Sequence, residues 1–283
     1  MKKITNGMSF LLAGALAMSV MVMSSCNKNS DLKPAANTNN ALIDGDELAG
    51  SPIAQWNFDS SWKESKQHLA GVGHNGVKYS STAQAHTGKS AFLSPDSGYV
   101  SYNSAGTALP NLTTGLTVDF WVYAYAQTGG ASCIFAIPQT GAFWPTHHVL
   151  LDGYNAAQGD SALIKVMFKA NKSIDYNERW EVVGGIPKFY KHWSHVQYSY
   201  DGSTSKFTLK VNNKTLIDHV VQYTDGTNTT LLGNLNANPG SHGVVIGGFQ
   251  NQWDSALFGD PQSWMLHFKG RIDGLKIYNT ALF

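Results

Sequence analysis

The sequence predicts an all-β protein, and three observations support that prediction. Aromatic and β-branched residues, which suit the pleated surface of a strand, are abundant, whereas the 283 residues include only four glutamates. Apolar and polar residues alternate with a period of two in several short segments bounded by turn-forming residues. After the N-terminal region, no long segment has the 3.6-residue apolar period of a helix. Residues 51–283 contain no linker-like boundary, so we expect one domain of a size usual for a β-sandwich.

The clearest strands follow one another along the chain. Residues 118–122 place apolar side chains on one face and Trp121 on the other, so we expect both faces of this strand to be covered. Residues 196–221 predict a three-strand meander, with turns at Asp201-Gly202 and Asn212-Asn213. In the last strand the apolar pattern changes phase at Gly274, which predicts a β-bulge.

Five patches of the sequence resemble, in order, the laminin-G-like branch of the concanavalin A-like lectin/glucanase family. The patches are Ile53–Asp59, Gly88–Phe92, Thr117–Val122, Trp193–Gly202 and Gly270–Asn279. This resemblance implies a two-sheet antiparallel β-sandwich, the concanavalin A-like jelly roll. It also implies that the tryptophans at its strand positions, Trp56, Trp121 and Trp193, belong to the core.

The N-terminal residues predict a lipoprotein signal peptide over residues 1–25. Lys2 and Lys3 precede an apolar run from Phe10 to Met23, which is shorter than the ~18 residues that a membrane span needs. The residues Met23-Ser24-Ser25-Cys26 resemble a bacterial lipobox, in which the cysteine is lipidated and becomes the mature N-terminus. An ordinary signal peptide followed by a chance cysteine is the alternative. We therefore expect Cys26 to anchor the protein in the cell envelope, at the outer membrane.

Residues 26–50 predict a flexible tether, because they include few large apolar side chains. The 20 basic and 19 acidic residues of the chain nearly balance, which gives no indication of nucleic acid or anionic lipid as a partner. If Cys26 is lipidated, Cys133 has no cysteine partner, and its apolar segment predicts a buried, inert thiol. Two Asp-Ser-Ala triplets, at residues 160–162 and 254–256, resemble the O-glycosylation signal of Bacteroidetes secretory proteins.

The motifs do not favour an enzyme. Glucanases of this family carry a Glu-x-Asp-x-(x)-Glu motif, and retaining hydrolysis needs two carboxyl groups about 5–5.5 Å apart. The sequence has no such motif, and Glu178 and Glu181 would fall on opposite faces of a strand, at a solvated surface. The adjacent His147 and His148 are not spaced to bind one metal ion. A divergent glycosidase or lyase remains an alternative, with carboxylates from among Asp152, Asp160, Glu178 and Glu181.

Tryptophans in predicted connections favour carbohydrate binding, because an exposed indole face can stack on a sugar ring. Asn251 and Asp254 flank Trp253 and offer an amide and a carboxylate to sugar hydroxyls. The predicted glycan-binding residues are Trp144, Asn251, Trp253, Asp254 and Trp264; Trp180 is a weaker candidate. Two alternatives remain open: Trp253 and Trp264 could simply cap the end of the sandwich, and the domain could be a protein-interaction or adhesion module.

The family resemblance also implies one structural Ca²⁺. Many relatives hold the ion with oxygens from the first and last strands, which correspond here to Asp59 and Asp273. Alternatively, Asp59 opens a turn and Asp273 accepts backbone hydrogen bonds at the bulge.

Overall fold

The structure, a computed structural model, describes residues 48–103, 109, 112–153, 159–170, 178–225, 228–236 and 243–283. All of these residues belong to one compact unit, Ala41–Phe283. The predicted signal peptide, the lipidation candidate Cys26 and nearly all of the tether lie outside the described residues. Within the described ranges, no helix has the length and apolar character required to span a membrane.

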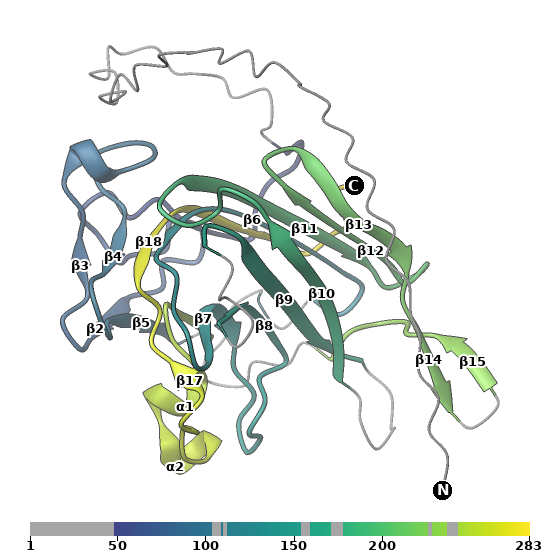
Figure 1. Cartoon of the computed structure of the whole chain (residues 1–283). Helices are drawn as coiled ribbons and strands as arrows, with labels where there is room; N and C mark the ends of the chain where they lie inside the picture. The colour runs from purple at the N-terminus through teal and green to yellow at the C-terminus, as the bar shows by residue number, and fades with distance from the viewer. Residues whose placement is uncertain are drawn as a thin grey trace, which may run out of the picture. The chain divides into compact units, whose positions relative to one another are not determined.

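Two eight-stranded sheets form a sandwich, which confirms the predicted all-β fold (Figure 1). We call them the first and second sheets, and apart from the parallel pair β17–β7 their strands pair antiparallel. In order across the first sheet lie β13 (Lys214–Val220), β12 (Lys206–Val211), β11 (Trp193–Asp201), β6 (Gly115–Ala124), β18 (Gly270–Tyr278), β4 (Phe92–Ser94) and β3 (Lys78–Tyr79), and β1 (Ala54–Trp56) also pairs with β18.

The second sheet carries most of the features discussed below. In order across it lie β10 (Glu178–Ile186), β9 (Ala162–Lys169), β8 (His147–Asp152), β7 (Ala131–Ile137), β16 (Val244–Ile246), β5 (Tyr99–Tyr102) and β2 (Gly71–His74), and β17 (Met265–Leu266) also pairs with β7. A separate hairpin joins β14 (Gln222–Asp225) to β15 (Asn228–Leu231). The helical segments are short: η1 (Thr82–Gln84), α1 (Gln250–Trp253) and α2 (Ser255–Phe258), and Figure 1 shows α1 and α2 near β17.

The core lies between the two sheets and follows the predicted alternation. Phe120 on β6 and Phe207 on β12 are fully buried, whereas Lys206 beside Phe207 is exposed. The predicted turn at Asn212-Asn213 and the bulge are also confirmed, and the chain turns after Asp201 over residues 202–205, where Ser205 and not Gly202 has a positive φ, of 56°. Asn212 and Asn213 adopt positive φ angles of 49° and 64° between β12 and β13, and the register of β18 against β6 shifts around Gly274, whose φ is 58°.

Three sequence interpretations are corrected by burial. Trp56 is fully buried as expected, but Trp121 and Trp193 lie half-exposed on the outer face of the first sheet. Period-two alternation explains this, because Trp121 follows the inward-facing Phe120 and its ring is covered in part by His86, with ring centroids 3.6 Å apart. Glu181 is not at a solvated surface: it is buried, and its carboxylate lies 2.9 Å from His219 Nε2.

Candidate functional site

A second apolar cluster covers part of the outer face of the second sheet. Its buried members come from β7, β8 and the segment around α1 and β17: Ala131, Cys133, Ala136, Leu150, Phe249 and Met265. The loop 138–146 also contributes, since Phe143 packs against this cluster. Cys133 is therefore buried, as predicted, and burial raises the pKa of its thiol well above the usual range.

Three tryptophans meet beside this cluster and form the walls of a pocket of about 370 Å³. The ring centroid of Trp144 lies 5.5 Å from that of Trp180, nearly perpendicular to it at 84°. Trp264 forms the third wall. Its ring centroid lies 5.7 Å from that of Trp144, and the two ring planes are inclined by 33°. All three side chains are half-exposed, and Val182 at the rim is 49% exposed, so the pocket opens to solvent.

Two charged side chains also line this pocket. Asp152, at the end of β8, forms an ion pair with Lys165 of the neighbouring β9. Both point away from the core, because the alternate residues Leu151 and Ile164 face inward and pair in register. The Asp152 side chain is buried and that of Lys165 is 32% exposed. The pocket thus combines apolar aromatic surfaces with one carboxylate and one ammonium group.

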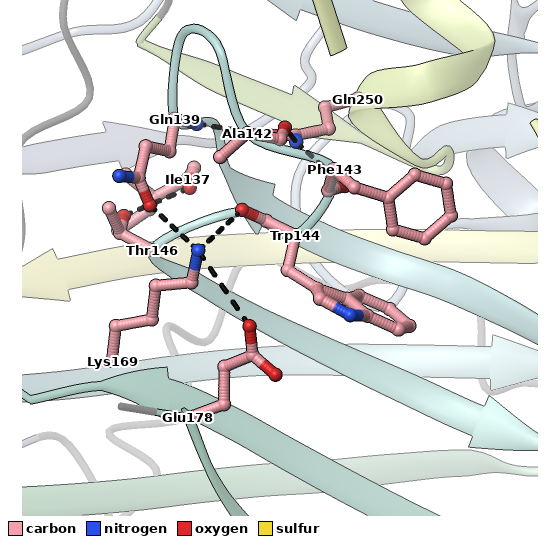
Figure 2. Close-up of polar contacts among 9 residues, drawn as sticks. All are labelled: Ile137, Gln139, Ala142, Phe143, Trp144, Thr146, Lys169, Glu178 and Gln250. Carbon is pink, nitrogen blue, oxygen red and sulfur yellow. Dashed lines mark hydrogen bonds and ion pairs between the residues drawn. The ribbon is translucent and has the colours of Figure 1, made fainter. Parts of the chain in front are cut away.

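Lys169 holds the loop that carries Trp144 (Figure 2). Its buried ammonium donates hydrogen bonds to Gln139 Oε1 at 2.8 Å and to the backbone carbonyl of Trp144 at 3.0 Å. The carboxylate of Glu178 lies 3.9 Å from the same nitrogen. Burial lowers the pKa of Lys169, and the charge of Glu178 opposes that shift.

Gln250 of α1 holds the same loop from another direction, as Figure 2 also shows. Its Nε2 donates to the carbonyls of Ala142 at 2.7 Å and Phe143 at 3.0 Å, while its Oε1 accepts from the N–H of Gln139 at 3.0 Å. Because Gln250 is only 1% exposed, these are buried contacts in which both ends of the amide are satisfied. The Trp144 wall is therefore fixed by two side chains, neither of which lines the pocket.

His148 lies beneath the tryptophans on the same face. Its ring centroid is 5.6 Å from that of Trp144 and 5.0 Å from that of Trp180. Burial lowers its pKa well below the usual value, with the neighbouring His147 and Lys169 adding to the shift. The imidazole is thus neutral at neutral pH. His147 faces the core instead, 2.5 Å from Tyr198 Oη, which agrees with the expectation that the two histidines do not share a metal ion.

The structure separates the five predicted glycan-binding residues into two groups. Trp144 and Trp264 line the pocket. Trp253, Asn251 and Asp254 do not line it; they lie at α1 and α2, in the long segment 249–268 between β16 and β18, which we call the helical insertion and which also carries Trp264. Asn251 is 2% exposed and its amide donates to the carbonyls of Phe258 at 2.6 Å and Gly259 at 3.2 Å.

Asp254 and Trp253 have local contacts within the insertion. The carboxylate of Asp254 accepts from the N–H of Leu257 at 3.1 Å, at the start of α2. The Trp253 ring lies 6.1 Å from Phe258. These contacts organise the insertion that carries Trp264.

The sequence pattern predicts only part of this pocket. It predicts a connection at Trp180, but Trp180 lies on β10 and lines the pocket. It indicates Asp152 only as a catalytic carboxylate and gives no role to Lys165. The alternation of Ala162, Ile164 and Val166 on β9 contained the missing signal, since it places Lys165 on the opposite face.

Asp152, Glu178 and Glu181 do not form the pair of carboxyl groups that a glycosidase requires. Glu178 pairs with Lys169, and Asp152 lies opposite Leu163, one residue beyond the pair Leu151–Ile164, so about 20 Å of strand β9 separates the two positions. This exceeds the ~5–9.5 Å separation of catalytic carboxyl groups in retaining and inverting enzymes. Glu181 points to the opposite face, toward His219. The pocket therefore offers Asp152 as its carboxylate among the described residues.

Asp59 and Asp273 approach the same loop, residues 86–90. Asp273 Oδ2 accepts from the N–H groups of His86 at 3.0 Å and Thr87 at 2.9 Å, as expected for a residue that receives backbone hydrogen bonds at the bulge. Asp59 Oδ1 accepts from the N–H of Ser90 at 3.1 Å. Burial raises the pKa of Asp273 to about 7, and the charge of Asp59 adds to this shift.

These two carboxylates fit the oxygen chemistry of Ca²⁺, and a cation would relieve their mutual repulsion. In the described part of the chain, however, no three side chains of histidine, cysteine, aspartate or glutamate are grouped to hold a metal ion. The six to eight ligands that Ca²⁺ takes would therefore need to include backbone carbonyls or water.

No protein-family profile matches the sequence, and no curated protein does. Solved structures do match the fold. The binding domain of botulinum neurotoxin DC in complex with SialylT has a TM-score of 0.51 and 11% identity, over 82% of this chain and 48% of that chain. A structure of botulinum neurotoxin type C, whose cell entry depends on two ganglioside molecules, gives 0.50 and 8% over the same shares.

The binding domain of Paraclostridial Mosquitocidal Protein 1 gives a TM-score of 0.50 and 10% identity, over 82% of this chain and 49% of that chain. The chain thus spans about half the length of these solved structures. At such low identity the likeness concerns the fold alone, and it agrees with the two-sheet β-sandwich that the sequence predicts.

Proposed function

We propose that this protein is a non-catalytic carbohydrate-binding lipoprotein of the cell envelope, and that it captures a glycan in the pocket formed by Trp144, Trp180 and Trp264. The observation that carries the proposal is that three half-exposed indole side chains line one pocket together with the ion pair of Asp152 and Lys165. Two of the three tryptophans come from segments that the sequence analysis selected for sugar stacking.

The chemistry of the pocket suits a sugar ring. The C–H groups on the face of a pyranose pack on an indole, while its hydroxyls need partners that both donate and accept. Asp152 accepts and Lys165 donates, so the pair meets that need at the edge of the aromatic walls. The volume of about 370 Å³ is at the lower end of the range for ligand pockets and suits one or two sugar rings.

The similar solved structures add general support. One of them is a complex with SialylT, and another concerns a toxin that depends on gangliosides. Those ligands belong to the toxins. For this chain the likeness supports a glycan as the class of partner by analogy of fold alone, since a fold does not determine a function.

Two further parts of the proposal concern the anchor and the cofactor. Lipidation of Cys26 would attach the domain to the outer membrane through the tether, and incorporation of a palmitate analogue that is lost in Cys26→Ser would test it. A structural Ca²⁺ at Asp59 and Asp273 would bring the first and last strands together. Calcium-dependent thermal stabilisation that disappears in Asp59→Asn would test that site.

The experiment that tests glycan binding compares variants of one residue type. The chain from residue 27 is titrated against a panel of plant, host and microbial glycans, with an assay for new reducing ends in each mixture. Trp180→Ala should weaken binding at least ten-fold, since it removes one wall, whereas Trp193→Ala, on the outer face of the first sheet, should leave it unchanged. Binding that survives Trp180→Ala, or the release of reducing ends, would contradict the proposal.

A further inference from the structure

We infer that the pocket selects uncharged sugars, and that Asp152 determines this selectivity by neutralising Lys165. This inference rests on the proposed function and specifies the class of glycan. Its basis is that each of the two ammonium groups at the site has a carboxylate partner. Lys165 pairs with Asp152, and Lys169 lies near Glu178.

Lys165 is the cation among the described residues that line the pocket. An acidic sugar would need it as the partner of its carboxylate. Its ammonium is already paired with Asp152, whose side chain is buried and only 5% exposed. An incoming carboxylate would therefore meet the negative charge of Asp152 at short range, and like charges at such a distance repel.

Lys169, the next ammonium group along β9, does not change this balance. It is 6% exposed, and its nitrogen contacts Gln139, the carbonyl of Trp144 and, at 3.9 Å, Glu178. Its charge is thus offset by Glu178 and its hydrogen bonds hold the loop behind the tryptophan wall. The ligand consequently meets a site with no net charge from these four side chains.

An uncharged sugar matches this arrangement better than an acidic one. Two neighbouring hydroxyls of a pyranose can approach the ion pair together, one donating to Asp152 and the other accepting from Lys165. No charge is then left unpaired, and the ring faces remain free to pack on the three indoles. The bound ligand keeps the ion pair of the free protein intact.

The test uses matched glycan pairs in which a carboxylate replaces the hydroxymethyl group of one ring, such as a glucoside and the corresponding glucuronide, or a galactoside and the corresponding galacturonide. The wild-type chain from residue 27 should bind the neutral member of a pair at least ten-fold more tightly. Asp152→Asn keeps the shape but removes the negative charge. It should weaken neutral binding about ten-fold and strengthen acidic binding by a similar factor, which reverses the preference.

A matched control removes the same charge elsewhere. Asp218 pairs with Lys206 at 3.0 Å on the first sheet, and both side chains are 48% exposed. Asp218→Asn should change neither affinity. A shift in preference in this variant equal to that in Asp152→Asn would overturn the inference, because net charge and not the pocket would then control the selectivity.

A second measurement does not depend on the folding of a variant. The affinity of the wild type for its ligand is measured at low and at high salt concentration. The dissociation constant for an uncharged sugar should change less than two-fold between them. A wild type that prefers acidic glycans, with affinity that falls steeply in salt, would overturn the inference and leave the proposed function standing. Binding to no glycan at all would refute both.

Discussion

Asp273 provides a prediction whose sign and magnitude follow from its surroundings. Its carboxyl group is fully buried on β18, and burial near Asp59 raises its pKa to about 7 from an ordinary 3.8. Folding therefore favours the protonated acid. The stabilisation by the neutral form is complete below the unfolded pKa near 3.8 and is lost as the pH rises through about 7.

The size of the effect follows from the two pKa values. A shift of one pKa unit corresponds to ~1.4 kcal/mol, so the change from 3.8 to about 7 corresponds to at most about 4 kcal/mol between pH 8 and pH 4. In the absence of calcium, the wild type should gain up to this amount relative to Asp273→Asn as the pH falls. The difference between the proteins removes the contributions of other titrating groups.

Denaturant unfolding of both proteins at closely spaced pH values, with EDTA present, measures that difference. A difference that stays constant from pH 8 to pH 4, or that changes in the opposite direction, would refute the reasoning. The same unfolding experiment is repeated with calcium in place of EDTA. If the ion binds the ionised carboxylates of Asp59 and Asp273, millimolar Ca²⁺ should stabilise the wild type at pH 8 and lose this effect below about pH 6.

Two other predictions concern groups that the structure buries. Lys169→Met should loosen the Trp144 loop, destabilise the fold by about 1–3 kcal/mol because Gln139 and the Trp144 carbonyl lose a buried donor, and weaken glycan binding about ten-fold. Denaturant unfolding and calorimetric titration check this, with the exposed Lys206→Met as the control; equal effects in both variants would contradict the role of Lys169. Cys133 should resist alkylation by iodoacetamide in the native protein and react fully in denaturant, because its thiol is buried and its pKa is raised. Rapid native labelling followed by mass spectrometry would show that β7 is open to solvent.

The strands could be predicted from the sequence because their signals are local. The alternation around Phe120 and Phe207 needs only neighbouring residues, and the turn at Asn212-Asn213 follows from side chains that tolerate positive φ. The phase change at Gly274 likewise predicted a bulge that the register of β18 shows. The same alternation assigned Trp121 to a face but gave no information on what covers that face, and so its burial was overestimated.

The pocket could not be predicted in the same way, because its walls come from three distant parts of the chain. Trp144 lies in a loop before β8, Trp180 on β10 and Trp264 before β17. Their meeting depends on strand order, which places β10, β9, β8 and β7 side by side. The ion pair of Asp152 and Lys165 likewise requires the register of β8 against β9. Sequence spacing alone does not contain this information.

The three walls differ in how they are held, and this difference indicates where the specificity of the site can change. Trp180 belongs to the sheet, so its position follows from the pairing of β10 with β9. Trp264 lies against Gly130, where an added Cβ would approach the Trp264 carbonyl to 2.2 Å, and this carbonyl accepts from the N–H of Ala131. Its position therefore depends on a glycine at the start of β7.

The position of Trp144 depends instead on the buried amide of Gln250 and the buried ammonium of Lys169, both of which donate hydrogen bonds to backbone carbonyls of its loop. A substitution at either residue could move one wall and leave the sandwich folded, because neither side chain belongs to the core between the sheets. The fold thus fixes one side of the pocket and leaves two sides adjustable. We expect the shape of the bound sugar to be determined mainly by the loop 138–146 and the segment 249–266.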